Sequence, residues 1–254
     1  MVCFLNRGFI VEQAIANLIE YYMESLNAEN IYKNFHVSVT NDHPFAHMII
    51  DNNYRSQDTF PCVVVTTHTD TKTPEMENMP VQTTCVGLNE TDIDNITNIY
   101  ETVIIGNKEK KRKIPGIVSI ASDETINHLK EIARKRGCVY GFCQRTRRTD
   151  SLSIEIWADN IQLKNELYEL LRLYLTSSLP LILQRKYKVF NPSIKDGSVR
   201  GERSNNFNFD FDVPLCGANL TVDVDYAVEQ ILIDTEAENF NKELIWEVIN
   251  HVKV

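Results

Sequence analysis

The amino-acid sequence predicts an α+β protein in which a small antiparallel or mixed β-sheet packs against two long helices. Residues 9–27 repeat apolar side chains at helical spacing, and Cys62-Val63-Val64-Val65 is a short β-branched run typical of a buried strand. Residues 151–176 change from a period of two to a helical period within a few residues. A strand that leads so directly into a helix forces that helix to pack back onto its own sheet.

The length and composition are those of an ordinary globular protein. The chain has 254 residues, of which 43% are hydrophobic and 24% are charged, enough to build the core of one large domain or two small ones. The six cysteines are scattered and follow no secretory signal, so we expect free thiols in a reducing cytosol. No apolar stretch approaches the roughly 20 residues of a membrane span. These features predict a soluble, cytoplasm-made protein without membrane contact.

The charge balance limits the class of partner. The net charge is −9, which argues against duplex nucleic acid as the main partner, because neutralising phosphates requires clustered Lys and Arg. It leaves room for a local basic patch.

The first half of the chain is expected to contain short strands separated by loops. Phe35, Val37 and Val39 alternate like a short strand, and a turn follows at 41–44. Residues 66–100 are polar and are interrupted by prolines, so we predict loops with one short strand around Val81–Val86. The remaining predictions are short strands at Val103–Ile105 and Ile117–Ile120, and a solvated loop or hairpin tip at Lys108–Lys113.

A capped helix is predicted over 124–136. Ser122 or Asp123 can cap its first turn, and Gly137 can end it. A strand at Cys138–Cys143 should follow, then a polar tip containing several arginines, and then a second strand that begins at Ser151.

Residues 151–176 carry the clearest local signal. Leu152, Ile154 and Ile156 alternate with polar residues, and Asp159 or Asn160 can cap the helix that follows. The apolar stripe of this helix is predicted to contain Ile161, Leu163, Leu167, Leu170, Leu171, Tyr174 and Leu175. Pro180 is expected to end the helical region, and Leu181–Phe190 is predicted to be a strand.

The C-terminal part is expected to extend the fold. We predict an exposed loop over 191–206, an aromatic strand at 207–212, a long strand at 219–234 with a bulge or end near Gln230, and a helix at 239–252. The predicted organisation is a core of residues 1–190, within which 66–150 are inserted, followed by a 191–254 extension that packs on the same core.

No motif indicates catalysis, a cofactor or a metal. The nine glycines form neither GxGxxG nor a P-loop. His43 and His47 are four residues apart, but Pro44 argues against a shared helix face. Cys138 and Cys143 lack zinc-site spacing and a second ligand pair. We therefore predict no catalytic, cofactor-binding or metal-ligating residues.

Two charged segments are candidates for contacts with partners. The basic segment Arg134–Arg148 suits nucleic acid, or else a helix C-terminus favoured by cations and a charged tip. Three carboxylates share one face of the long C-terminal strand, which suits a channel lining or a salt-bridged subunit contact, or else a soluble edge strand. The candidate subunit-interface or channel-facing residues are Asp223, Asp225, Glu229, Arg145, Arg147 and Arg148.

Three segments together resemble a known family. They are Ala14–Tyr22 (AIANLIEYY), Phe60–Val65 (FPCVVV) and Ile154–Leu175 (IEIWADNIQLKNELYELLRLYL). In hydrophobic pattern and element order they are similar to the tail terminator and head–tail joining (neck) proteins of tailed bacteriophages and contractile injection systems. The resemblance carries no diagnostic motif, and the chain is longer than the small members of that family. It implies an N-terminal helix on a small antiparallel sheet and assembly into closed rings, often hexamers.

The resemblance also implies a function. The protein would be a structural virion protein of the tail or neck, assembled in the host cytoplasm, that caps the tail tube and sheath. Its partners would be further copies of itself, tube and sheath proteins and the head connector, with no catalysis, cofactor, membrane or sequence-specific nucleic acid. Two alternatives stay open: a nucleic-acid-binding or packaging-associated protein that uses Arg134–Arg148, and an enzyme of a type that the sequence does not reveal.

Overall fold

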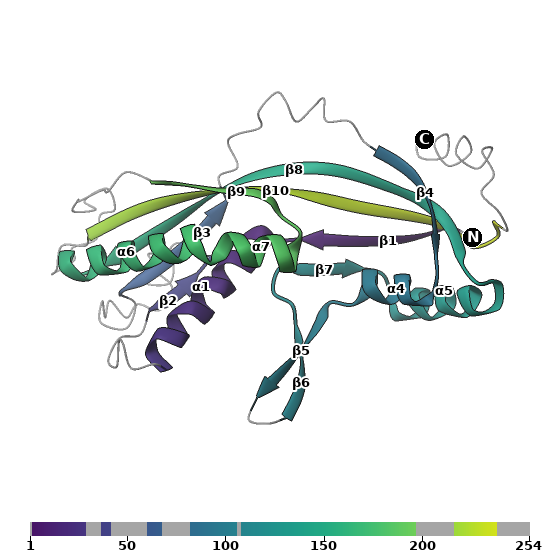
Figure 1. The fold of residues 1–254 in the computed structure, drawn as a ribbon, viewed down its shortest axis with the longest axis horizontal. Helices are drawn as coiled ribbons and strands as arrows, with labels where there is room; N and C mark the ends of the chain where they lie inside the picture. Colours follow the sequence, from purple (N-terminus) through teal and green to yellow (C-terminus); the bar gives the residue numbers. More distant parts are fainter. Residues whose placement is uncertain are drawn as a thin grey trace, which may run out of the picture. The chain divides into compact units, whose positions relative to one another are not determined.

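The computed structural model describes residues 2–28, 37–41, 60–67, 82–105, 108–196 and 216–237 (Figure 1). The chain forms two compact units, each built from segments that are distant in sequence. Unit 1 contains Met1–Ile10, Glu75–Arg148 and Ala227–Val254, and unit 2 contains Val11–Pro74 and Thr149–Tyr226.

The α+β class is confirmed, but the sheet is larger than predicted, and the described residues form five helices, three of which correspond to helices predicted from the sequence. The main sheet has eight strands in the order β2-β3-β8-β10-β1-β7, with β4 also paired to β8 and β9 also paired to β10. Its two longest strands are β8 (Val139–Ala158) and β10 (Cys216–Asp234). Both contribute residues to each unit.

β8 corrects one prediction. Cys138–Cys143 and the segment from Ser151 were predicted as two strands separated by a polar tip, but they are parts of one strand of 20 residues. The arginine-rich middle stays in the ladder because the neighbouring strand supplies polar partners for it, as when Glu229 accepts from Arg145.

Unit 1 combines antiparallel strands with two helices. Its further main-sheet strands are β1 (Val2–Phe9), β4 (Gln82–Leu88) and β7 (Ile117–Ile120), and its helices are α4 (Glu90–Thr97) and α5 (Asp123–Arg136). β1 pairs with both β10 and β7, and α4 packs on α5, β1 and β4. The buried core side chains are Cys3, Leu5, Leu88, Ile93, Leu129, Ala133, Val139, Cys143, Ile231 and Ile233.

The helix ends in unit 1 follow local capping chemistry. The predicted cap of α5 is confirmed, since the Ser122 side chain accepts from Thr125 N–H and Gly137, with φ 90°, ends the helix. α4 was not predicted, because it is short and lies within the polar stretch read as loops. It begins at a capping box in which Asn89 and Asp92 exchange side-chain-to-backbone hydrogen bonds.

A separate two-stranded sheet also belongs to unit 1. β5 (Tyr100–Ile105) pairs antiparallel with β6 (Lys108–Lys113) (Figure 1). The strand predicted at Val103–Ile105 is confirmed within β5. The segment predicted as a loop or hairpin tip is instead a strand, because β5 offers it a complete hydrogen-bonding partner.

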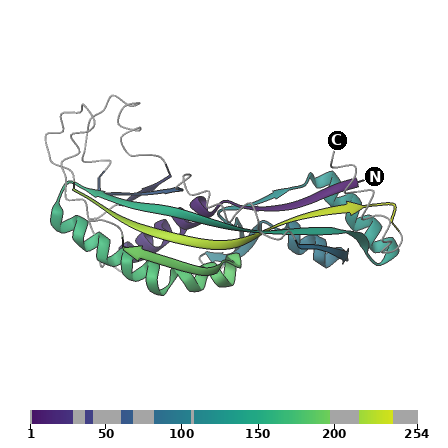
Figure 2. The ribbon, with the colours of Figure 1, turned by 90° about the horizontal axis from the view of Figure 1, so that it is seen from above.

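Unit 2 contains the segments with the strongest sequence patterns. Its helices are α1 (Val11–Ala28), α6 (Ile161–Ser177) and α7 (Leu179–Tyr187), and its further strands are β2 (Ser38–Thr40), β3 (Cys62–Thr67) and β9 (Phe190–Asp196). β3 pairs antiparallel with β8 and parallel with β2, and α7 packs on β9 (Figure 2). The predicted helix of residues 9–27 is confirmed as α1, but Phe9 belongs to β1 and the helix begins at Val11.

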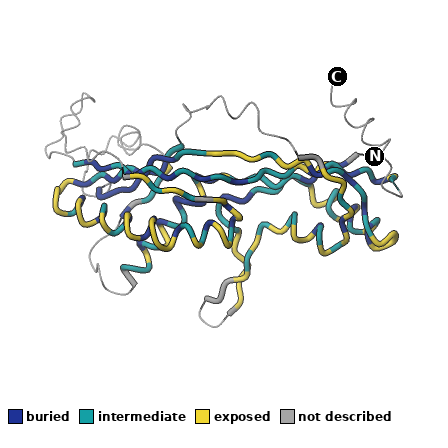
Figure 3. The backbone as a smooth tube through the Cα atoms, turned by 45° about the horizontal axis from the view of Figure 1, so that its top comes forward, coloured by how far each residue is buried: buried dark blue, intermediate teal, exposed yellow. Residues whose placement is uncertain are grey.

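The strand-helix segment at 151–176 is confirmed, with one change in its stripe. Asn160 caps α6 by accepting from Gln162 N–H. Ile161, predicted to be apolar core, is 59% exposed, whereas Lys164 is only 2% exposed and lies on the buried side. Figure 3 shows the exposed residues of α6 on its outer turns.

α7 corrects the strand predicted at Leu181–Phe190. Pro180 lies in the first turn of α7, where its missing N–H is tolerated. Leu179, Leu183 and Tyr187 recur four residues apart and are buried on one side of this helix. Only at Phe190 does a strand begin.

Buried and more exposed residues alternate along β10, as predicted, and the strand continues past Gln230 to Asp234. Val222, Val224 and Tyr226 are buried, but from Ile231 onward the odd-numbered residues are buried. The register shift is in the pairing with β9, between Asp223 and Asp225. The aromatic strand at 207–212, the helix at 239–252, most of the 191–206 loop, His43 and His47 lie outside the described residues.

Candidate interaction surfaces

The carboxylates of β10 in unit 2 have donors on both neighbouring strands. From β8, Ser151 Oγ donates to Asp223 Oδ1 at 2.7 Å, and Thr149 Oγ1 donates to Asp225 Oδ1 at 2.5 Å. From β9, Lys195 Nζ lies 2.6 Å from Asp223 Oδ2. Asp223 therefore connects three strands through its side chain.

These contacts keep Asp223 ionised. Partial burial acts to raise the pKa of this carboxyl, but the hydrogen bonds from Lys195 and Ser151 outweigh it and hold the pKa below its usual range. The side chain is 25% exposed, so solvent screens part of the attraction.

Glu229, the acidic residue of β10 that lies in unit 1, forms an ion pair with Arg145. Arg145 Nε donates to Glu229 Oε1 at 2.8 Å, and its terminal nitrogen reaches the same oxygen. The hydrogen bond and charge of Glu229 raise the pKa of the Arg145 guanidinium. The predicted row of Asp223, Asp225 and Glu229 does lie along one strand, but it is not an uncompensated acidic face.

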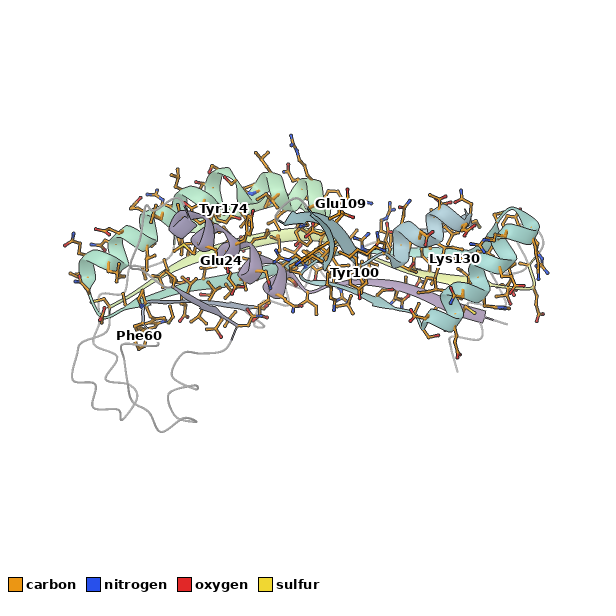
Figure 4. The ribbon with its side chains drawn as sticks, turned by 90° about the horizontal axis from the view of Figure 1, so that it is seen from below. Glu24, Phe60, Tyr100, Glu109, Lys130 and Tyr174 are labelled. Atoms are coloured by element: carbon orange, nitrogen blue, oxygen red, sulfur yellow. The ribbon has the colours of Figure 1, made fainter. Side chains whose placement is uncertain are left out.

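The basic segment Arg134–Arg148 is largely engaged within the chain. Arg134 pairs with Glu90, and the hydrogen bond from Arg134 lowers the pKa of that carboxyl. Lys135 pairs with Glu131 at 2.6 Å, and Arg136 donates to the Thr235 carbonyl at 3.0 Å. Lys130 on α5, labelled in Figure 4, forms an ion pair with Asp94 of α4.

Arg147 and Arg148 are the remaining candidate residues. Both are exposed on β8. Four of the six cations of the segment have partners inside unit 1, which reduces the positive charge that the segment can offer to phosphates.

The three segments with the family-like pattern come together in unit 2. β3 pairs with β8 from Cys62↔Trp157 to Thr67↔Leu152. Tyr174 of α6 stacks on Tyr22 of α1 with ring centroids 4.1 Å apart, and Tyr174 Oη donates to the Leu18 carbonyl at 3.2 Å. Figure 4 shows Tyr174 beside α1. Burial raises the pKa of Tyr174 to about 12.

The described residues keep the side chains that could ligate a metal apart from one another. They contain no group of three His, Cys, Asp or Glu side chains that would hold a metal ion. All six cysteines are free thiols. Burial, followed by the charge of Glu155, raises the pKa of Cys62 to about 12, so this thiol is not an activated nucleophile. Within the same described ranges, no helix is both long and apolar enough to cross a membrane.

Sequence reasoning missed the surface of β6. Lys110, Lys111, Arg112 and Lys113 are exposed, and none of them pairs with a carboxylate in the part of the chain that the structure describes. A signal was present, because the β-branched run of β5 is separated from β6 by only Gly106 and Asn107, a pair typical of tight hairpin turns.

Searches of protein-family models and of curated proteins found no match to this chain.

Proposed function

We propose that this protein is a structural, ring-forming subunit of a phage tail or neck: a tail terminator that caps the tail tube and sheath and docks to the head connector. One observation carries the proposal. The segments that resemble the terminator family, Ala14–Tyr22, Phe60–Val65 and Ile154–Leu175, pack on one another in unit 2.

This packing matters because the segments are far apart in the sequence. Together they build one core, with helices on a sheet, from three distant parts of the chain. Here the N-terminal helix lies against the capped helix that follows the strand, and the buried run Val63–Val65 pairs with that strand. The resemblance implies the same arrangement of helix and sheet for the family.

The charged residues favour this function over the nucleic-acid alternative. Four cations of the Arg134–Arg148 segment are held by partners within unit 1: Arg134, Lys135, Arg136 and Arg145. Breaking these pairs to bind phosphate would offset part of the gain from counterion release.

Ring assembly suits a protein whose subunit contacts are individually modest. In a closed ring each contact is repeated, and every subunit is held from two sides, so closure strengthens weak interfaces. No catalytic step is required of such a subunit.

Negative-stain microscopy combined with mass measurement of the purified chain tests the proposal. Rings, with six subunits as the number that the resemblance implies, are the expected result. A chain that stays monomeric at high concentration and also fails to bind tail tubes would contradict it. Binding of nucleic acid that weakens steeply with salt would favour the alternative.

A further inference from the structure

The β5–β6 hairpin is a small sheet of its own within unit 1. Its base is closed where Ile114 N–H donates to the Ile99 carbonyl at 2.7 Å. It is not part of the eight-stranded sheet, and none of the other described elements of unit 1 packs extensively against it. Figure 1 shows it standing away from α4 and β7 of the same unit, so the hairpin has the form of an arm.

β6 presents cations on both of its faces. Lys111 and Lys113 lie opposite Thr102 and Tyr100, while Arg112 lies opposite Glu101 on the other face. Five of its six residues are basic, and Lys110 to Lys113 are all exposed. Cations elsewhere in unit 1, such as those of α5, are instead used in ion pairs.

An arm of this kind is poorly stabilised by itself. A two-stranded hairpin is marginal in water, and neighbouring like charges weaken it further. Protection of a sheet edge against unwanted pairing requires only a few charged side chains, whereas β6 is almost entirely basic. Contact with an acidic surface would relieve the repulsion and order the arm.

An acidic surface of suitable form exists on α1. This helix contains three glutamates and no basic residue. Glu20 and Glu24 are exposed one turn apart, and Tyr21, which follows Glu20, is 61% exposed. They lie in the C-terminal half of the helix, towards the end where the backbone dipole favours cations over anions.

Building on the proposed ring, we infer that the β5–β6 arm of one copy docks onto the acidic face of α1 in a neighbouring copy. Residues 100–113 carry five basic and two acidic residues, a net +3, in a chain whose total is −9. Every copy therefore carries both a cationic arm and an anionic acceptor. A head-to-tail contact between unlike surfaces is the kind that closes into a ring.

The same charges favour a second copy over nucleic acid as the occupant. Outside the arm the chain carries a net −12, obtained by subtracting the arm's +3 from −9. That field repels nucleic acid, whose phosphates carry no cations of their own, whereas a second copy presents a cationic arm to the acidic helix.

Charge reversal in the full-length chain tests the inference. The arm variant is Lys111→Glu with Lys113→Glu, which face the neutral Thr102 and Tyr100 and so create no like-charge pair across the hairpin. The acceptor variant is Glu20→Lys with Glu24→Lys. Sedimentation equilibrium should show self-association weakened about tenfold or more in each variant alone.

An equimolar mixture of the two variants is the decisive sample. The arm of one variant is now acidic and the α1 face of the other is now basic, so the two again carry opposite charges. Mixed assemblies should therefore form with an affinity close to that of the unmodified chain. The matched control for the arm variant, Arg185→Glu with Lys188→Glu, makes the same change of −4 in net charge at exposed positions of α7 and its C-cap, and it should assemble normally. Circular dichroism checks that every variant is folded.

The possible results separate the two proposals. If the unmodified chain forms rings and the arm variant forms them equally well, the arm inference is overturned and the proposed function stands. If the unmodified chain never self-associates, either alone or on tail tubes, the proposed function fails and the arm inference fails with it. Arm-dependent binding of a DNA duplex by the monomer would then assign the hairpin to nucleic acid.

Discussion

Asp223 has donors on both sides, Ser151 from β8 and Lys195 from β9, so a single carboxylate joins three strands of unit 2. The Asp223 carboxylate therefore stabilises the pairing of these strands through its hydrogen bond and ion pair. The same holds for Glu229, whose carboxylate is occupied by Arg145. At the scale of the residue, Asp223 and Glu229 of β10 stabilise the fold through hydrogen bonds and ion pairs with neighbouring strands.

A stability contribution that depends on pH follows for Asp223. Its pKa is lowered in the folded state, so the stabilisation is present above the usual aspartate pKa and is lost as pH falls through the folded value. We predict that Asp223→Asn lowers the free energy of unfolding by about 1 kcal/mol at pH 7. In urea titrations the difference from the unmodified protein should shrink below about pH 4. A difference that is unchanged at pH 3, or an equal loss for the exposed Asp159→Asn, would contradict it.

β8 and β10 approach one another closely in unit 1. A Cβ placed on Gly141 of β8 would lie 2.4 Å from the carbonyl oxygen of Leu232. The obstructing atom belongs to the backbone of β10, so it cannot move aside as the end of a flexible side chain does. At the scale of the element, glycine is required at this position for the two strands to pair.

The substitution Gly141→Ala should therefore be costly. We predict a loss of about 2–3 kcal/mol in the free energy of unfolding, because the ladder must distort to admit one methyl group. Gly8→Ala in β1 is the control, since its added Cβ would find its nearest atoms at 3.7 Å. That variant should change stability by less than about 0.5 kcal/mol. Thermal melting of both proteins makes the comparison, and equal losses would refute the close-approach argument.

The two units share the strands β8 and β10, each of which passes from one unit into the other. Local unfolding of one unit would have to break these strands at an internal position. At the scale of the whole molecule, this continuity favours a single cooperative transition.

Thiol labelling during urea unfolding checks this cooperativity. Cys3 in unit 1 and Cys62 in unit 2 are buried, whereas Cys85 is exposed. The pKa of Cys62, raised to about 12, suppresses its thiolate further in the folded protein. We predict that Cys85 reacts at once in native buffer, and that Cys3 and Cys62 become reactive together at one urea concentration. Mass spectrometry that finds one of them reactive well before the other would show independent units.

The sequence by itself determined the elements whose signals are local. The sequence was enough to predict the apolar stripe of α1, the β-branched run of β3 and the caps Ser122, Gly137 and Asn160. Each of these depends on residues within a few positions of one another. The tertiary structure decided the rest. β1 is a strand because β10 and β7 pair with it on both sides, and α7 is a helix because it buries three apolar side chains four residues apart.

The same division holds for the candidate surfaces. The sequence identified the acids of β10 and the arginines of β8 as charged residues on strands. It could not reveal that Ser151 reaches Asp223 or that Arg145 reaches Glu229, because strand pairing joins residues more than 70 positions apart. Only the tertiary structure decides which charges are neutralised within the chain and which, like those of the β5–β6 arm, stay exposed, because neutralisation depends on distances in space that composition and spacing do not encode.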